Sequence, residues 1–491
     1  MPPSRYPLLF QINTRVWLTA ISRDLGRPAT LDDIPDAALL RLAQLGFEWV
    51  WLLSVWRTGA AGQAISRGNT EWRKEFAQTL PDLRDEDIAG SGFAITGYTV
   101  AENLGGDAAL ARLRQRLRHH GLRLMLDFVP NHTGLDHPWV QEHPEYYISG
   151  SEQDLLRTPQ NWGRTGAGPG ARILAHGRDP FFPGWPDTFQ LNYGHPALQE
   201  AMIAELLKIA TQCDGVRCDM AMLVLSDIFE NTWGIAAQPF WPKSTRRVRE
   251  QTPGFVFMAE VYWDQEWTLQ QQGFDYTYDK RLYDRLRQDQ ARPLREHLQA
   301  GLEYQDKLAR FMENHDEPRA AASFSEGVHQ AAAVIAFLTP GLRLFHQGQL
   351  EGFKIRISPH LGRGPTEPVD LKIHDFYERL LAILRRDVLR NGQWRLLPCG
   401  PAWECNESCD GFIVFTWQGD SQERLVVVVN FSPHRSQCYV RLPEFPDGVW
   451  RLKDLLSNVQ HDRRGEELRS KGLFLDEPGW RALVFEVERG G

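Results

Sequence analysis

Stretches of mostly apolar residues recur along the first 390 residues of the chain, and amphipathic stretches separate most of them. The apolar stretches are short and nearly continuous, as in strands buried on both faces, whereas the amphipathic ones have the spacing of helices. Eight strands are predicted, at residues 8–18, 47–56, 122–130, 214–222, 254–263, 273–279, 308–316 and 341–349, the sixth being the weakest. Helices are predicted at 32–46, 107–121 and 195–212. Gly46 and Gly121 mark the ends of the first two helices, and Asp32 or Asp33 lies near the cap of the first.

This alternation determines the predicted fold class. Continuous apolar strands that alternate with helices indicate a parallel sheet covered on both faces. Eight such strands favour an α/β chain built on a closed (β/α)₈ TIM barrel. The rival is an open doubly wound sheet, but its usual glycine-rich phosphate loop after the first strand is missing.

Two stretches interrupt the alternation and set the predicted domains. Residues 132–194 are rich in Gly, Pro, Trp and His without clear periodicity, which predicts a small inserted domain after the third strand. From residue 391 the pattern changes to short β stretches with turns between them, which predicts a C-terminal antiparallel β-sandwich at 391–491. The catalytic barrel is then expected at 1–131 and 195–390.

Composition and charge exclude some classes of function. The 491 residues are 42% apolar and 24% charged, as in a soluble globular protein with a large core. The formal net charge of -8 disfavours a nucleic-acid partner. The first 18 residues resemble no signal peptide and no apolar run reaches membrane-spanning length, so we expect a cytoplasmic protein without a membrane partner. The six irregularly spaced cysteines are then expected to be free thiols, although Cys405 and Cys409 lie close enough in sequence to meet.

Four predicted barrel strands end in polar side chains that a buried strand does not normally carry. These are Asp127, Asn131 and His132 on the third strand, Arg217 and Asp219 on the fourth, Glu260 on the fifth, and Asn314, His315 and Asp316 on the seventh. Each alone has a structural explanation as a helix cap, an ion pair or a turn. Because the carboxyl ends of barrel strands form one face, the whole set predicts an active site there.

Glycosidic bond cleavage is the chemistry that needs this set. A retaining mechanism uses one carboxylate as nucleophile and one carboxylic acid as proton donor, about 5–5.5 Å apart. Asp219 lies next to the positive charge of Arg217, which keeps a nucleophile ionised. Glu260 lies among apolar and aromatic residues, which raise the pKa of a carboxyl group as a general acid requires. A further carboxylate and neutral imidazoles would assist the positively charged transition state.

Four motifs in this order resemble the α-amylase family, glycoside hydrolase family 13. They are "DFVPNH", "GVRCDMAM", "AEVYW" and "ENHD", and "DTFQLNYGHP" is similar to the segment by which that family re-enters the barrel. The resemblance covers essentially the whole chain. It implies α-linked glucosides as substrates, cleaved with retention of configuration.

The resemblance also implies a role for each residue. Asp219 would be the nucleophile, Glu260 the general acid/base, and Asp316 the third carboxylate, which holds sugar hydroxyls. Asp127 would support the network at the strand ends. The implied substrate-binding residues are His132, Arg217, His315, Phe93 and Asn314, with Arg217 also supporting the nucleophile and Phe93 stacking on the cleaved sugar.

Three departures from the family pattern bear on specificity. Met222 and Leu223 stand where typical α-amylases carry a Lys-His pair, which argues against the usual subsites for long starch. Phe93 replaces a tyrosine and keeps only the stacking face. The aspartate by which many exo-acting α-glucosidases hold the terminal sugar is replaced near Gly90 and Ser91.

The sequence therefore predicts a retaining α-glucosidase or amylase for malto-oligosaccharides or related α-glucosides. A transglucosylase or sucrose-phosphorylase-like glucosyltransferase on the same triad is the alternative. A non-catalytic binding subunit is disfavoured, because all three carboxylates are present. No cofactor is expected. Asn131 resembles a family calcium ligand, but no Asp/Asn-rich loop of calcium-site spacing accompanies it, so a structural calcium is the less favoured alternative. The sequence does not indicate an oligomeric state.

Overall fold

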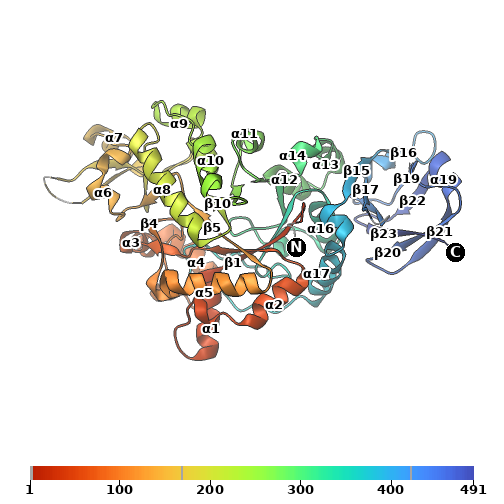
Figure 1. Ribbon diagram of the computed structural model, residues 1–491, viewed down its shortest axis with the longest axis horizontal. Helices are drawn as coiled ribbons and strands as arrows, with labels where there is room; N and C mark the ends of the chain where they lie inside the picture. Colours follow the sequence, from red (N-terminus) through yellow and green to blue (C-terminus); the bar gives the residue numbers. More distant parts are fainter. Residues whose placement is uncertain (1–3, 167, 169, 421–422, 491) are drawn as a thin grey trace.

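The computed structural model describes residues 4–166, 168, 170–420 and 423–490, and its centre is a closed barrel (Figure 1). The barrel has eight parallel strands, and the last strand pairs with the first. In chain order they are β1 (Leu8–Asn13), β2 (Trp49–Leu53), β5 (Arg123–Phe128), β10 (Gly215–Cys218), β11 (Val256–Ala259), β12 (Tyr276–Tyr278), β13 (Leu308–Phe311) and β14 (Leu342–His346). The predicted (β/α)₈ barrel is confirmed, and all eight predicted strands contribute to it.

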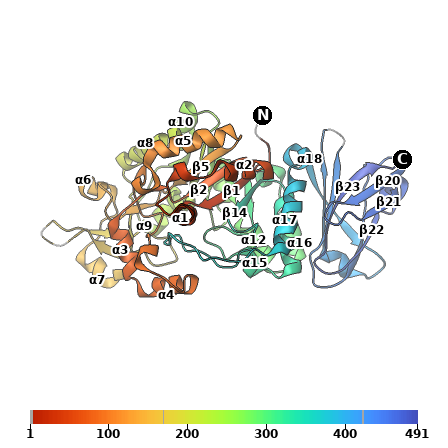
Figure 2. The same cartoon turned by 90° about the horizontal axis from the view of Figure 1, so that it is seen from below.

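Helices surround the barrel in both views (Figures 1 and 2). The longer ones are α1 (Thr14–Leu25), α2 (Asp36–Leu45), α5 (Gly106–His119), α8 (Pro196–Gln212), α10 (Trp241–Gln251), α12 (Lys280–Arg287), α13 (Ala291–Leu298), α16 (Glu326–Leu338) and α17 (Leu371–Leu384). Gly46 closes α2 in the left-handed conformation with φ of 93°, as its position in the sequence predicts. Among the described residues no helix is long and apolar enough to cross a lipid bilayer.

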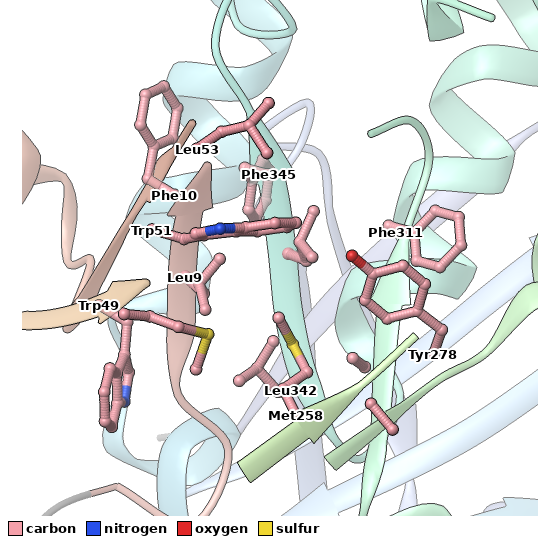
Figure 3. Close-up of a cluster of buried hydrophobic side chains, with 14 of the residues drawn as sticks. Leu9, Phe10, Trp49, Trp51, Leu53, Met258, Tyr278, Phe311, Leu342 and Phe345 are labelled. Atoms are coloured by element: carbon pink, nitrogen blue, oxygen red, sulfur yellow. The ribbon is translucent and has the colours of Figure 1, made fainter. Parts of the chain in front are cut away.

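The barrel interior is filled by large side chains. Figure 3 shows Trp51 of β2 lying across the interior, on the same side of the sheet as Tyr278 of β12. Phe345 of β14 lies on the outer face, where its ring stacks on Phe337 of α16 with ring centroids 4.0 Å apart. All three of these strand side chains are almost fully buried. Because the helices cover the outer face of the same strands, both faces are buried, which explains the continuous apolar runs in the sequence.

The first strand is shorter than predicted. The sequence pattern extends a strand to residue 18, but β1 ends at Asn13 and α1 begins at Thr14. The Asn13 side chain accepts a hydrogen bond from the Val16 backbone N–H and so caps the helix. Of the apolar residues after this cap, Leu18 is buried under the helix, whereas Val16 and Trp17 are half-buried.

The start of α2 also differs from the prediction. Neither Asp32 nor Asp33 caps this helix, which begins at Asp36 after Pro35. Asp33 instead accepts a hydrogen bond from the Thr30 backbone N–H and closes a short 3₁₀ turn.

The stretch 132–194 folds beside the barrel mouth. Its elements are β6 (His132–Gly134), α6 (Trp139–Glu142), α7 (Glu152–Arg157), β7 (Trp162–Arg164), β8 (Ile173–Ala175) and β9 (Thr188–Gln190). Strand β9 pairs antiparallel with β6, so Gln190 lies opposite His132 and Thr188 opposite Gly134. A second excursion, which the sequence analysis does not predict, follows β2 and consists of β3 (Trp56–Thr58), α3 (Ala60–Gly68), α4 (Thr70–Thr79) and β4 (Ile95–Val100).

The C-terminal region forms two antiparallel sheets at the end of the molecule opposite α6 and α7 (Figures 1 and 2). The larger sheet contains β15 (Gln393–Leu397), β17 (Phe412–Gln418), β18 (Arg424–Asn430), β20 (Val449–Asp454), β21 (Gln460–Arg464) and β23 (Ala482–Arg489). The smaller contains β16 (Cys399–Pro401), β19 (Ser436–Val440) and β22 (Leu473–Glu477).

Strand β18 explains how this region joins the rest. Its Val426 and Val428 pack in a core shared with the smaller sheet, whereas Val427 and Val429 belong to the main core that includes the barrel. The uninterrupted valine run is therefore buried on both faces, and the predicted antiparallel β-sandwich is confirmed.

Candidate active site

The predicted catalytic carboxyl groups come together at the carboxyl ends of neighbouring strands. Asp219 follows β10 and Glu260 follows β11 directly. The Asp219 N–H donates to Phe128 O (2.8 Å) and the Glu260 N–H to Cys218 O (3.0 Å), so the strand ladder continues past the assigned ends. The backbone that carries both carboxyl groups is thereby part of the rigid barrel.

Arg217 joins these two carboxyl groups. Its Nη1 lies 2.7 Å from Asp219 Oδ1 and its Nη2 2.6 Å from Glu260 Oε2. Asp127 on the adjacent strand lies 4.0 Å from the same guanidinium. The Arg217 side chain is fully buried, and because a planar fork fits two carboxylates at once, it fixes their relative position.

Asp127 is a buried anchor beneath this group. It accepts hydrogen bonds from Trp51 Nε1 (3.0 Å) and from the Ser54 backbone N–H (3.2 Å). Burial raises its pKa to about 7, while the nearby charge of Arg217 acts in the opposite direction.

Glu260 has an environment that favours its protonated form. Its Oε2 accepts from Arg217 and from the Met220 backbone N–H (2.8 Å), and the Tyr262 hydroxyl donates to Oε1 (3.0 Å). Burial is the main cause that raises its pKa to about 8; Arg217 opposes this shift, and the negative charges of Asp219 and Asp316 add to it. A glutamate with this pKa keeps its proton at neutral pH, as the apolar sequence context predicts.

The turn after β13 positions Asp316. Asn314 Oδ1 accepts hydrogen bonds from the backbone N–H groups of Asp316 and Glu317, each at 2.9 Å. Buried Glu313 holds the end of the turn, pairing with Arg319 Nη1 at 2.6 Å. The Asn314 side chain is buried and is not among the residues that line the cavity, so the structure shows it shaping the turn. Its predicted contact with substrate stays a prediction.

His315 is held as a neutral imidazole. Gln11 Nε2 lies 2.8 Å from its Nδ1, which then accepts, so the proton of the neutral ring is on Nε2. Nε2 lies 3.1 Å from Asp316 Oδ2. Burial and the charge of Arg217 lower the pKa of His315 well below its usual range. Gln11 is a polar residue inside the apolar run of β1, and the sequence analysis assigned it no role.

His132 and Phe93 both line the cavity next to the carboxyl groups. The His132 ring contacts Trp185, with ring centroids 5.2 Å apart, and burial lowers its pKa. The Phe93 ring lies 5.4 Å from the His315 ring and 5.2 Å from the guanidinium carbon of Arg217. Phe93 therefore offers an apolar face directly above the charged groups.

A cavity of about 280 Å³ is lined by five of the predicted site residues, namely Phe93, His132, Asp219, Glu260 and Asp316. Arg217, His315, Asn314 and Asp127 lie behind these residues and are not part of the lining. The complete lining consists of Trp72, Ser91, Phe93, His132, Trp185, Asp187, Thr188, Asp219, Met220, Glu260, Asp316, Pro359 and His360. The sequence analysis assigned no role to Trp72, Trp185, Asp187 or His360. Trp72 lies in α4, and the other three lie in irregular segments. An acid-base pair beside aromatic faces and neutral imidazoles is an arrangement suited to breaking a sugar acetal.

The structure shows where the residues lie that replace the Lys-His pair of typical α-amylases. Met222 and Leu223 lie in a short 3₁₀ turn and are buried in the main core, so neither can contact a sugar. Met220, which has a positive φ of 41°, lies at the surface of the site instead. It also lines a second cavity of about 440 Å³, together with Tyr262, Trp263 and Phe182.

Comparisons with known proteins agree with this geometry. The model of the α-amylase catalytic domain matches residues 39–357. The α-amylase MalA of Haloarcula japonica is 25% identical over 279 residues, which are 55% of this chain but only 38% of that protein. A 4-α-glucanotransferase of Thermotoga neapolitana is 23% identical over 67% of this chain and 70% of its own length. The chain thus spans little more than a third of the Haloarcula relative.

Solved structures share the fold over the full length. The maltogenic α-amylase AmyB of Thermotoga neapolitana superposes with a TM-score of 0.71 at 18% identity, covering 98% of both chains. The family match extends over more than half of the chain, and it includes the strands that carry the four motifs. By this match, and by the carboxyl groups gathered at the barrel mouth, the chain belongs to the α-amylase family.

Proposed function

We propose that this chain is a retaining α-glycosidase that acts on malto-oligosaccharides or related α-glucosides. Asp219 attacks the anomeric carbon, and the bond from this carbon to the leaving oxygen breaks as that oxygen takes a proton from Glu260. Glu260 Oε2 already accepts two N–H groups, so the proton resides on Oε1. The products of this step are the free leaving sugar and a covalent glucosyl-enzyme.

The second half of the reaction releases the sugar. Glu260, now ionised, removes a proton from water, whose oxygen bonds to the anomeric carbon while the ester bond to Asp219 breaks. Two inversions give net retention. We assign the binding of sugar hydroxyl groups to neutral His132 and to Asp316, which line the cavity, and to neutral His315 next to Asp316. None of these side chains adds positive charge next to the developing oxocarbenium ion.

One observation carries this proposal: a single buried guanidinium contacts both Asp219 and Glu260. The fork holds the two carboxyl groups side by side, which fits the short separation of a retaining pair better than the about 6.5–9.5 Å of an inverting pair. The same contact places a positive charge 2.7 Å from Asp219 Oδ1, an oxygen of the carboxyl group proposed to attack.

Transfer to a second sugar is the alternative that a specific feature favours. The second cavity adjoins the acid/base through Met220 and Tyr262, and it presents the aromatic rings of Trp263 and the exposed Phe182. Aromatic faces bind sugar rings, so a sugar hydroxyl bound there could replace water in the second step. The similarity to a 4-α-glucanotransferase supports the same alternative.

A donor screen tests the proposal. Purified protein is incubated with maltose, maltotriose, maltoheptaose and sucrose, with and without inorganic phosphate, and products are followed by chromatography and by proton NMR at early times. We expect cleavage with the α-anomer as first product. Initial release of the β-anomer would refute retention, whereas glucose 1-phosphate or longer oligosaccharides would assign phosphorolysis or transfer.

Catalysis without a metal ion is a further part of the proposal. Gln190 Nε2 donates to Asn131 Oδ1 at 3.0 Å, which leaves that oxygen poorly placed as a calcium ligand. The described residues also hold no group of three or more His, Cys, Asp or Glu side chains spaced for a metal. We therefore expect dialysis against EDTA to leave kcat/KM and the melting temperature unchanged. A loss of either that added Ca²⁺ restores would contradict this expectation.

A cytoplasmic location completes the proposal. All six cysteines are free thiols in the described structure, which fits a reducing compartment. Fractionation of the producing cells, with the protein detected by an antibody, checks the location.

A further inference from the structure

The catalytic cavity has a donor end and an acceptor end. Glu260 protonates the leaving oxygen, so the leaving sugar lies on the side of Glu260. Tyr262 and Met220, which bond to Glu260, line the second cavity of about 440 Å³ on that side. The glucosyl unit that becomes attached to Asp219 must therefore extend the other way, among the residues that line only the first cavity.

The donor end is closed by two loops that bind each other. Trp72 of α4 packs on His360, with ring centroids 4.6 Å apart, and both line the cavity. The backbone N–H groups of Ala89 and Gly90 donate to His360 O at 2.8 and 3.1 Å. Ile88 forms an antiparallel bridge with Leu361. The loop before β4 and the loop after β14 are thus joined across the end of the cavity.

The two joined loops form a wall that is packed into the rest of the fold. Behind it, Ile88 and Leu361 pack with Phe76 and Leu80 in a separate buried cluster. Arg363 makes a two-bond contact with Asp87, with both distances at 2.6 Å. Since apolar packing and a bidentate ion pair hold the loops, the wall stands where a second donor-side sugar would have to continue.

Asp187 is the unexplained group inside this closed end. It directly precedes β9, is only 3% exposed and lines the cavity. Within the described structure its Oδ2 makes no hydrogen bond. Burial raises its pKa to about 6. A buried carboxyl oxygen without a partner is unfavourable, and the hydroxyl groups of a sugar are donors that would satisfy it.

We propose that Asp187 accepts hydrogen bonds from hydroxyl groups of the terminal, non-reducing glucosyl unit, and that the walled cavity makes the enzyme exo-acting. This inference rests on the proposed function. At Gly90 and Ser91 themselves the chain carries no carboxyl group, although Ser91 lines the cavity. Asp187 supplies a carboxyl group to the same cavity from another loop.

An end-blocked substrate tests the exo action. p-Nitrophenyl α-maltoheptaoside is compared with the same compound whose terminal glucose carries a 4,6-O-ethylidene group. We expect the blocked compound to be cleaved at least about 100-fold more slowly, because the closed end has no space for the added group. Equal rates would overturn the inference while leaving the glycosidase proposal intact.

Substitutions of Asp187 test the contact itself. Asp187→Asn is expected to lower kcat/KM for α-glucosyl fluoride by about 10- to 100-fold, the usual loss for a hydrogen bond to a charged group. The loss should shrink for the 4-deoxy or the 6-deoxy donor, whichever lacks the contacted hydroxyl. Equal losses on all three donors, or no loss, would overturn the role.

Two controls separate this role from a structural one. Asp136→Asn changes an exposed aspartate of the same region and should retain full activity. Oδ2 of Asp187 has no hydrogen-bond partner among the described residues, so Asp187→Asn should melt at or above the wild-type temperature at pH 8. A clear decrease would contradict the assignment. If the wild type cleaves no donor, the proposed function fails. The role of Asp187 is then tested by measuring the Kd of 1-deoxynojirimycin for the wild type and for Asp187→Asn by calorimetry. An unchanged Kd in Asp187→Asn refutes the inference.

Discussion

Asp219→Asn is expected to lower kcat by about 10⁴-fold or more on every donor, because an amide cannot form the glycosyl ester. Melting temperature and circular dichroism should stay close to wild type. The backbone of residue 219 is held by Phe128 O, and Arg217 keeps its contact with Glu260. Residual activity within tenfold of wild type would refute the nucleophile assignment.

Chemical rescue makes this test independent of stability. Asp219→Gly removes the side chain and leaves space for azide, which can attack the anomeric carbon of α-glucosyl fluoride as fluoride departs. The carbon–nitrogen bond forms on the face opposite the broken carbon–fluorine bond, so the product expected by NMR is β-glucosyl azide. Asp316→Gly is the matched control: it removes a carboxyl group of the same cavity that does not attack, so azide should not rescue it.

The eight barrel strands were predictable because their burial on two faces leaves a strong apolar signal. Even β12, with three residues, was detectable from "YTY" next to polar residues. The boundaries were less predictable. In β1 the change from strand to helix at Asn13 depends on one side chain bonding to the Val16 N–H, and a hydrophobic pattern does not register such a local bond.

The charged residues at the strand ends could be predicted from the sequence, because a carboxylate or guanidinium at the end of an apolar strand requires an explanation. Their hydrogen-bond partners from distant parts of the chain could not be predicted. Gln11 and His315 are 304 positions apart in the sequence, yet they share a hydrogen bond. Asp187 lies in a stretch without periodicity. That its Oδ2 has no partner in the described part of the chain becomes visible only once the surrounding loops are placed.

Met222 and Leu223, which replace the Lys-His pair of typical α-amylases, could be interpreted fully only from sequence and structure together. The comparison indicated that Met222 and Leu223 cannot serve as sugar ligands of the usual kind. The structure shows that both lie in the core, and that Met220 and Tyr262 form the adjoining surface. We therefore expect specificity on the acceptor side to depend on a different set of residues from that in typical α-amylases.

Glu260→Ala is expected to lower kcat/KM for maltose by about 10²- to 10⁴-fold, because the leaving sugar oxygen then departs without a proton. The loss should be much smaller for α-glucosyl fluoride, whose fluoride ion leaves readily without general acid. Formation of the glucosyl-enzyme survives in this variant, so azide should trap it in the second step as α-glucosyl azide. An azide product of the β configuration would contradict the assignment of the two carboxyl groups.

The pH profile of the wild type should report the same residue. As the proposed general acid, Glu260 must be protonated, and burial raises its pKa to about 8. We therefore expect kcat/KM to stay high below this pH and to fall as the pH rises through it. Glu266 is a second buried glutamate of the neighbouring cavity, with a pKa raised by burial to about 7, and it could imitate this limb. Glu266→Gln should keep the alkaline limb near pH 8, whereas Glu260→Ala should abolish it. Alanine at position 260 has no titrating side chain. If the alkaline limb survives in Glu260→Ala, the limb must therefore be assigned to another group.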